Sequence, residues 1–369
     1  MNIPLVDLRA QAAEIADEVE PQILEVLRSA HYIGGPHVAA FEKEFSEYVG
    51  VAHTIGVANG TDAVELALRA VGVVAGAEVI MPANTFIATA EAASRIGAIP
   101  VPVDVDPDHL LISPEAVAAA ITGKTRAIVP VHLFGQAAPV EALEPIASAA
   151  GIPIVEDGAQ SQGATRNGRA AGGLGLVAAT SFYPGKNLGA SGDAGAVTTD
   201  DPSMAERVRL VANHGSATRY VHDAVGINSR LDAIHAVTLR AKLARLSDWN
   251  RRRQDAADRY AELLADVPKV TVPRSMPGNR DVWHLYVIRV PERDRILAEL
   301  NAAGVGAAVH YPDPWHLAPA YAHLGYRPGC APVAERAAGE ILSLPIYPHL
   351  TDEQQLAVVR ALRTAVGDG

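Results

Sequence analysis

Short apolar runs alternate with alanine-rich segments over most of the chain. Between about residues 50 and 240, runs rich in β-branched residues are separated by stretches with helical spacing of apolar positions. This alternation is typical of a sheet wound through βαβ units. The strands predicted from it are 53–57, 78–81, 99–103, 126–130, 152–156, 179–182 and 196–198, and the helices between them are 63–71, 86–95, 114–120 and 139–150. Because these strands are nearly all apolar, we expect both faces of the sheet to be covered.

The pattern changes after residue 230. Helical spacing continues from Leu231 to about Leu264, with an apparent interruption near Ser247 and Asp248. We therefore expect an α/β protein with two domains, a large one with a mostly parallel mixed sheet and an N-terminal helical segment (1–245) and a smaller α+β domain (246–369). The elements predicted in the second domain are a strand at 283–290, a helix at 292–303, a strand at 306–311 and a helix at 352–366, with loops at 273–279 and 325–330.

Composition and charge narrow the possible partners. The 369 residues are 49% hydrophobic, which is enough for a large core, and the formal net charge is −11. A chain of this sign is expected to bind neither nucleic acid nor acidic membranes without specific sites. No apolar run approaches the roughly 20 residues that span a bilayer, and the first residues lack the features of a signal peptide. We therefore expect a cytoplasmic protein.

The chain has a single cysteine, Cys330. One cysteine excludes an intrachain disulfide and a thiolate metal cluster, and it fits a reducing compartment. We interpret it as an incidental thiol at or near the surface, and no metal site is expected.

Lys186 is the leading candidate for a catalytic residue. It lies in the motif at residues 181–189, Ser-Phe-Tyr-Pro-Gly-Lys-Asn-Leu-Gly, on a predicted tight turn at the edge of the sheet. A lysine that forms a Schiff base needs such a position, where its surroundings keep part of the amine unprotonated. An isolated loop lysine is more often solvated, but the neighbouring motifs favour the catalytic interpretation.

Asp157 follows a buried strand, at the edge where open α/β sheets bind ligands. A carboxylate there can stabilise a protonated pyridine nitrogen, as pyridoxal phosphate requires. Gln160 could bond the ring hydroxyl, or could be an ordinary buried glutamine. Phe86 could stack on the cofactor, although core packing explains an aromatic residue equally well. Glu156 should point to the opposite face of the sheet and is expected to be structural.

The cofactor phosphate needs backbone N–H donors and hydroxyl groups. Gly60 and Thr61 lie between a predicted strand and a helix, where both kinds of donor are available. Gly60 would allow close approach of the backbone, and Thr61 would offer its hydroxyl and cap the helix. Ser181 would add a second hydroxyl. Alone, the same residues would also fit an ordinary capped turn.

Five motifs occur in an order and spacing that resemble the DegT/StrS sugar-nucleotide aminotransferases. They span residues 60–63, 82–86, 156–160, 181–189 and 226–232, and the likeness extends from residue 4 to residue 348. The resemblance implies the aspartate-aminotransferase fold (fold type I), with pyridoxal phosphate as cofactor and pyridoxamine phosphate as its intermediate form. It further implies that Lys186 forms the Schiff base, Asp157 pairs with the ring nitrogen and Gln160 contacts the ring hydroxyl. Asn228 would reach the cofactor phosphate of the partner subunit, which implies a homodimer with shared active sites.

Two positions depart from the family pattern. Gln162 stands where the family commonly has histidine, and Gly175-Leu176 stands where a Gly-Asp pair is common. Neither change removes a catalytic group, but both bear on substrate fit. Lys186 itself argues against the related dehydratases, which carry histidine at that position.

Residues 309–317 resemble the segment of family members that aminate carbon 3 of a nucleotide-linked keto sugar, with dTDP or UDP as the nucleotide. His310 and His316 could bond sugar hydroxyls or the diphosphate, and Tyr311 could cover the sugar; either histidine could equally be a satisfied surface residue. Further candidate substrate contacts are Tyr183, Arg219 and Tyr220, which lie in or near motifs that face the substrate in the family. The amino donor implied is L-glutamate, with the amine of Lys186 as general base.

Three other functions are alternatives to this one. Amination at carbon 4 and a non-catalytic regulatory protein that binds pyridoxal phosphate both remain alternatives. Residues 173–178 formally match a dinucleotide fingerprint, which would indicate a nicotinamide-dependent oxidoreductase. That fingerprint must follow a strand and open a helix, whereas this one precedes a predicted strand, so we reject it.

Overall fold

A computed structural model of the chain describes residues 2–367. Its main sheet has the strand order β3-β2-β4-β5-β8-β9-β1, in which single bridges from Ile128 to Ile154 and from Val131 to Asp157 join β4 to β5. All neighbouring pairs are parallel except those of β9, which runs antiparallel to β8 and β1. The strands are β1 (His53–Val57), β2 (Glu78–Pro82), β3 (Ile99–Val103), β4 (Thr125–Ile128), β5 (Val155–Asp157), β8 (Val177–Ser181) and β9 (Gly195–Thr199). The predicted mixed, mostly parallel sheet is therefore confirmed.

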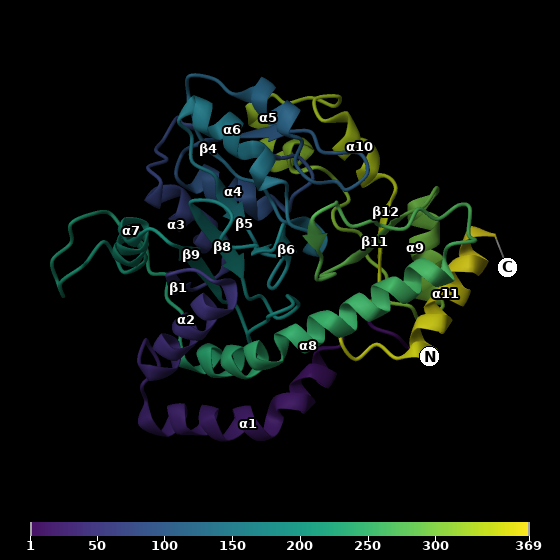
Figure 1. Cartoon of the computed structure of the whole chain (residues 1–369), viewed down its shortest axis with the longest axis horizontal. Helices are drawn as coiled ribbons and strands as arrows, with labels where there is room; N and C mark the ends of the chain where they lie inside the picture. The colour runs from purple at the N-terminus through teal and green to yellow at the C-terminus, as the bar shows by residue number, and fades with distance from the viewer. Residues whose placement is uncertain (1, 368–369) are drawn as a thin grey trace.

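Helices cover both faces of this sheet (Figure 1). Alternate residues of one strand enter different cores: Val79 and Met81 pack with one set of helices, whereas Ile80 packs with another. This is the two-residue period of a strand buried on both sides. One face is covered by α3 (Gly60–Ala70), α4 (Ile87–Arg95) and α7 (Pro202–Ala212), and the other by α2 (Pro36–Val49), α5 (Pro114–Ala120), α6 (Val140–Ala150) and α8 (Ala233–Leu263).

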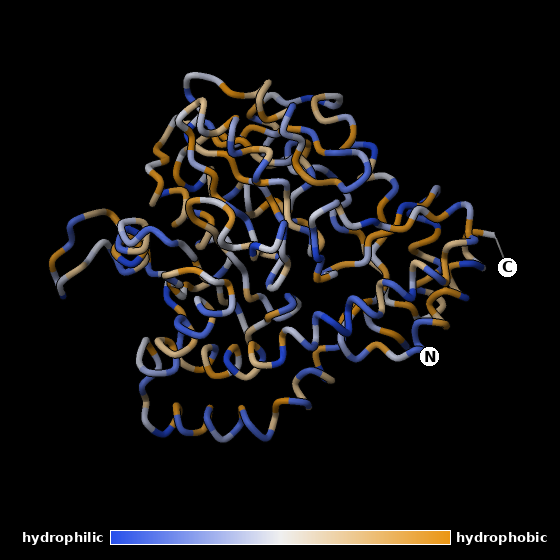
Figure 2. Tube along the Cα trace, in the orientation of Figure 1, coloured by the Kyte–Doolittle hydropathy of each residue, from blue (hydrophilic) through white to orange (hydrophobic). Residues whose placement is uncertain are grey.

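The N-terminal helix α1 (Leu8–Ser29) lies outside these layers and packs along α8 (Figure 1). The side chain of Asp7 caps it by accepting hydrogen bonds from the N–H groups of Arg9 and Ala10. Hydrophobic and hydrophilic positions alternate along its trace (Figure 2), as expected for a helix that buries a single face.

Helix α8 is continuous over 31 residues. The predicted interruption near Ser247 and Asp248 is wrong, because Asp248 lies within the helix and pairs with Arg252, four residues later, at 2.8 Å. Polar residues at that point mark the exposed face rather than a break. The neighbouring Arg253 is instead fully buried and donates to the backbone carbonyls of Trp283 and Ile346.

The second half of α8 contributes to a separate C-terminal core. This core contains an antiparallel pair, β11 (Tyr286–Arg289) and β12 (Ile341–Leu344), with helices α9 (Arg293–Ala302) and α11 (Asp352–Val366) packed on it. Ile3 belongs to the same core, so a residue near the N-terminus packs among residues from the C-terminal part of the chain. The proposed division at residue 245 falls inside α8 and stays a prediction.

The strand predicted at 306–311 is not formed. Only Ala308 makes a bridge, to Ser343, because the N–H groups of the two preceding residues are used elsewhere. The N–H of Gly306 donates to Ile3, and that of Ala307 to Val305. The loops predicted at 273–279 and 325–330 have no regular structure apart from Asn279, which opens β10 (Asn279–Arg280).

The remaining elements are short. They are β6 (Thr165–Arg166), β7 (Arg169–Ala170), η1 (Leu133–Gly135), η2 (Trp315–Leu317), η3 (Pro319–Leu324) and α10 (Pro332–Ala338). Among residues 2–367, no helix combines the length and the apolar character needed to span a membrane.

Candidate active site

Asp157 lies at the C-terminal end of β5, beside the strand that leads to Lys186. It is 6% exposed and is paired with Ala179 across the parallel β5–β8 ladder. Its carboxylate accepts a hydrogen bond from the hydroxyl of Thr89 on α4 at 2.7 Å and one from the N–H of Ala159 at 3.1 Å. These two bonds fix the direction of the carboxylate. It lies at the edge of the sheet, near the turn that follows β8.

Lys186 lies on that turn, as the sequence predicted. Its N–H donates to the carbonyl of Tyr183 at 2.8 Å. Gly189 is required at the end of the turn, because a Cβ there would lie 2.2 Å from the carbonyl oxygen of Pro184. Burial lowers the pKa of the Lys186 amine to about 8, and the nearby Asp157 offsets part of this change. The unprotonated, nucleophilic form of the amine is therefore far more populated near neutral pH than in an exposed lysine, at roughly a tenth of the molecules at pH 7.

Gln160, Tyr311 and Phe86 form one wall of the site. The side-chain oxygen of Gln160 accepts from the N–H of Phe134 at 2.6 Å, and its amide nitrogen donates to the Tyr311 hydroxyl at 3.1 Å. The Tyr311 ring lies against Phe86 with centroids 5.1 Å apart. Phe86 is 51% exposed, so core packing does not explain this aromatic residue.

The N-terminus of α3 meets the end of β8. A Cβ on Gly60 would lie 2.5 Å from the Cβ of Ser181, so only glycine permits this approach. The predicted role of Thr61 as helix cap is wrong, because Asn59 caps α3 by accepting from the N–H of Asp62 at 2.8 Å. The Thr61 hydroxyl is left without a hydrogen bond in the described chain, and the first N–H groups of α3 have no acceptor within the helix.

His310 precedes Tyr311 in the chain and is a second candidate substrate residue beside this group. Its Nδ1 is 2.8 Å from the hydroxyl of Ser343 on β12. Burial lowers its pKa to about 4, and the positive charge of Lys186 acts in the same direction. His310 is therefore neutral at physiological pH and can exchange hydrogen bonds without adding charge. Tyr183, at the start of the Lys186 turn, is exposed.

The structure does not bring the other predicted residues to this group. Asn228, Arg219 and Tyr220 are exposed on the segment after α7, where the guanidinium carbon of Arg219 lies 4.9 Å from the centre of the Tyr220 ring. This segment extends away from the body of the protein (Figure 1).

His316 is buried, and its Nε2 lies 3.3 Å from Glu335. Exposed Cys330 completes a cluster whose donor atoms lie within 4.8 Å of one another. Glu335 already accepts the N–H groups of Gly329 and Ala331, so this cluster is explained by loop packing.

Glu156 is structural, as predicted. It is fully buried and accepts hydrogen bonds from His132 at 2.7 Å and from the N–H groups of Gly172, Leu174 and Gly175. Burial raises the pKa of its carboxyl, but the hydrogen bond from His132 and those from the backbone outweigh burial and leave the pKa below its usual value.

The sequence did not indicate three further residues around the site. Thr89 donates to Asp157, while Asn187 and His284 bond each other beside Lys186. Thr89 lies three positions after the motif at residues 82–86. That proximity is the only feature of the sequence that could have indicated a place in the site. His284 is 97 positions from Asn187, so no local pattern could have linked them.

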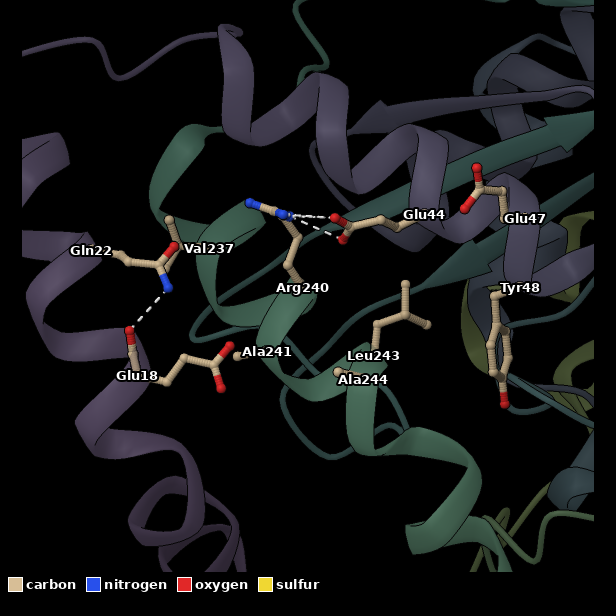
Figure 3. A pocket seen from close by; sticks show the side chains of 10 residues that line it. All are labelled: Glu18, Gln22, Glu44, Glu47, Tyr48, Val237, Arg240, Ala241, Leu243 and Ala244. Atoms are coloured by element: carbon tan, nitrogen blue, oxygen red, sulfur yellow. Dashed lines mark hydrogen bonds and ion pairs between the residues drawn. The ribbon is translucent and has the colours of Figure 1, made fainter.

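A large cavity of about 530 Å³ lies elsewhere, between α1, α2 and α8 (Figure 3). Arg240 crosses it and is bound by both carboxylate oxygens of Glu44, with the closest contact at 2.7 Å. None of its lining residues belongs to the group around Lys186.

The residues around Lys186 fit pyridoxal phosphate. Because Gly60 lies close to Ser181, the N–H groups at the start of α3 and the Ser181 hydroxyl lie side by side and could bind a phosphate. The Asp157 carboxylate could pair with a protonated ring nitrogen. The Lys186 amine, with its lowered pKa, could react with the cofactor aldehyde. The fold and this set of groups define a pyridoxal-phosphate-dependent aminotransferase.

More specifically, the chain belongs to the DegT/DnrJ/EryC1/StrS aminotransferase family, which matches residues 13–363. It is 48% identical to the erythromycin biosynthesis sensory transduction protein EryC1 of Saccharopolyspora erythraea, over 98% of this chain and 99% of that protein. It is 46% identical to a dTDP-3-amino-3,4,6-trideoxy-α-D-glucose transaminase of Streptomyces venezuelae, over 98% and 96% of the two chains.

Solved structures agree with this assignment. The S. venezuelae DesV structure in complex with a ketimine intermediate superposes with a TM-score of 0.95, at 45% identity, over 98% of both chains. The ntda protein of Bacillus subtilis was solved with bound cofactor PMP; it shares 32% identity, with a TM-score of 0.89, over 96% of this chain and 82% of that one. Pyridoxal phosphate is therefore the cofactor of this enzyme.

Proposed function

We propose that this enzyme transfers an amino group from L-glutamate to carbon 3 of a keto sugar linked to dTDP or UDP. The observation that carries the proposal is the placement of the Lys186 amine, with its lowered pKa, beside the buried carboxylate of Asp157 at the ends of two sheet strands. The similarity to a dTDP-3-amino sugar transaminase over nearly the whole chain supports carbon 3.

Bound pyridoxal phosphate supplies an electron sink for the carbanion that forms at the amino acid α-carbon. Lys186 would hold the cofactor through its amine and would also serve as the general base that moves a proton. Asp157 would keep the ring nitrogen protonated, and Gln160 would contact the ring hydroxyl. Gly60, Thr61 and Ser181 would hold the phosphate, and Phe86 would lie against the ring.

Substrate recognition is assigned to residues next to the cofactor group and in the family motifs. Neutral His310 would bond a sugar hydroxyl, and Tyr311, held by Gln160, would cover the sugar. Tyr183, Arg219 and Tyr220 stay predictions from the family motifs. His316 stays one too, although its contacts with Glu335 provide a structural explanation.

The purified enzyme should show a visible absorbance band from the lysine-bound cofactor. L-Glutamate is expected to remove this band by converting the cofactor to its amine form, and 3-keto sugar nucleotides are expected to restore it. The measurement is the absorbance spectrum before and after each addition, with dTDP and UDP forms tested separately. Restoration by 4-keto sugar nucleotides alone would move the reaction to carbon 4. A band that glutamate does not change would favour a non-catalytic, regulatory protein.

We also propose that the active site is completed by Asn228 of a second copy of the chain. In support, Tyr220 and Val225 on the segment after α7 are 79% and 92% exposed, which favours burial against another subunit. A homodimer with two shared sites would result.

Mixing two inactive variants tests this shared site. In a mixed dimer of Lys186→Ala and Asn228→Ala subunits, one site keeps both residues and the other loses both. At a cofactor concentration that leaves Asn228→Ala empty, an equal mixture should recover roughly a quarter of the wild-type activity, because half of the dimers are mixed. If the refolded mixture shows no more activity than the sum of the two variants, Asn228 acts within its own subunit.

Finally, we propose a cytoplasmic location, in keeping with the single exposed cysteine. Recovery of the enzyme in the membrane or extracellular fraction of its host would contradict this location.

A further inference from the structure

Asn187, the residue after Lys186, is buried and uses its whole side-chain amide. It is 2% exposed. Its Nδ2 donates to the side-chain oxygen of Asn250 and to the backbone carbonyl of Val282, both at 2.8 Å. Its Oδ1 lies 3.2 Å from Nδ1 of His284. A surface turn needs no such anchor, so the burial of Asn187 calls for a role.

The direction of the bond to His284 follows from its surroundings. Burial lowers the pKa of His284 well below its usual value, and the positive charges of Lys186 and Arg253 lower it further. The imidazole is therefore neutral. Since Val282 can only accept, the Nδ2 of Asn187 must face it, and Oδ1 is left to accept the proton on Nδ1 of His284.

The partners of Asn187 come from separate parts of the fold. Asn250 lies in the middle of α8, and its own Nδ2 donates to the carbonyl of Gln162 at 2.9 Å. The side chain of Gln162 in turn donates to the Thr180 hydroxyl at 2.7 Å and to the Ser181 carbonyl at 3.0 Å. Asn187 thus connects its turn to α8 and, through Gln162, back to the end of β8.

The other two partners lie on the segment that enters the C-terminal core. This segment is tied to η1 on both sides of His284: the N–H of Val282 donates to the carbonyl of Gly135 at 3.0 Å, and that of Leu285 donates to the carbonyl of Phe134 at 3.2 Å. The same Phe134 bonds Gln160 in the site wall. The Lys186 turn is therefore held against the irregular segment that precedes β11 and against α8.

We propose that Asn187 is a positioning residue, which holds the turn so that the Lys186 amine stays out of water and beside Asp157. The proposal rests on the function proposed above for Lys186. Without the Asn187 amide, Asn250, Val282 and His284 would each lose a buried partner, and water or a rearranged turn would have to replace it. The amine would then become more exposed and lose part of its nucleophilic character.

The test compares Asn187→Ala with wild type and with Asn279→Ala. Asn279 also makes two side-chain hydrogen bonds, to Ala137 and Arg166, but it contacts neither the turn nor its partners. Cofactor-free protein is labelled with trinitrobenzenesulfonate over a range of pH, and the Lys186 peptide is quantified by mass spectrometry. The formation rate of the visible band is measured separately after addition of pyridoxal phosphate.

Wild type and Asn279→Ala should label Lys186 with a midpoint near pH 8. Asn187→Ala should move this midpoint upward, toward the ordinary lysine value of about 10.4, and slow band formation by about tenfold. An unchanged midpoint and rate, with only a lower melting temperature, would overturn the proposal, because Asn187 would then be merely structural.

A second variant covers the case in which Asn187→Ala does not fold. Asn250→Leu keeps the number and branching of the side-chain heavy atoms and removes one acceptor of Asn187 without changing Lys186, and it should shift the labelling midpoint in the same direction by a smaller amount. If it folds with an unshifted midpoint, the proposal fails. If no variant and no wild-type protein forms a visible band while the labelling midpoints still differ, the proposed function fails and the positioning role stands.

Discussion

Lys186→Ala is expected to lower the rate of transamination by about 10³-fold or more, since it removes both the covalent attachment and the general base. The variant should also lose the visible band of the lysine-bound cofactor, because its site has no amine beside Asp157. The measurements are the rate of the first half-reaction with L-glutamate and the absorbance spectrum, both at saturating pyridoxal phosphate.

Lys186→Arg is the matched control for charge. It keeps a cation near Asp157 but stays protonated, so it should be as inactive as the alanine variant. If either variant kept a tenth of the wild-type rate, the amine of Lys186 would not be the group that carries the reaction.

Asp157→Asn should cost about 10²-fold or more in the same half-reaction. The amide matches the carboxylate in shape and can still accept from Thr89, but it cannot balance the charge of a protonated ring nitrogen. The loss should appear in the single-turnover rate with glutamate rather than in the melting temperature.

Glu156→Gln provides the comparison one residue away. Its carboxylate holds His132 and the loop at residues 172–175 on the other face of the sheet. We expect this change to lower the melting temperature while the folded fraction keeps its single-turnover rate. Equal kinetic losses in Asp157→Asn and Glu156→Gln would show that Asp157 has no special part in the chemistry.

Much of the sheet could be predicted because its strands carry a local signal. The apolar runs at 53–57 and 99–103 coincide with β1 and β3, and the helix predicted at 352–366 coincides with α11. The candidate site was predictable for a related reason: Asp157, Ser181 and Lys186 follow strands that end at one edge of the sheet. Such positions can be recognised from order along the chain.

The errors arose where distant contacts decide the structure. Residues 306–311 have the composition of a strand, but the contact between Gly306 and Ile3 directs the backbone elsewhere. Asn59 and Thr61 are both good capping residues, so the local sequence does not decide which of them caps α3. The approach of Gly60 to Ser181 depends on the tertiary structure. Likewise, the bond between Asn187 and His284 depends on how the C-terminal core meets the sheet.

The unbroken length of α8 limits how the subunit can move. The helix is about 45 Å long at 1.5 Å per residue; Leu239 and Leu243 pack in a core of the large sheet, and Tyr260 packs in the C-terminal core. A helix without proline or glycine in its interior offers no hinge. Any closure over a bound sugar nucleotide would therefore have to tilt α8 as a rigid unit, which favours a site preformed before the substrate arrives.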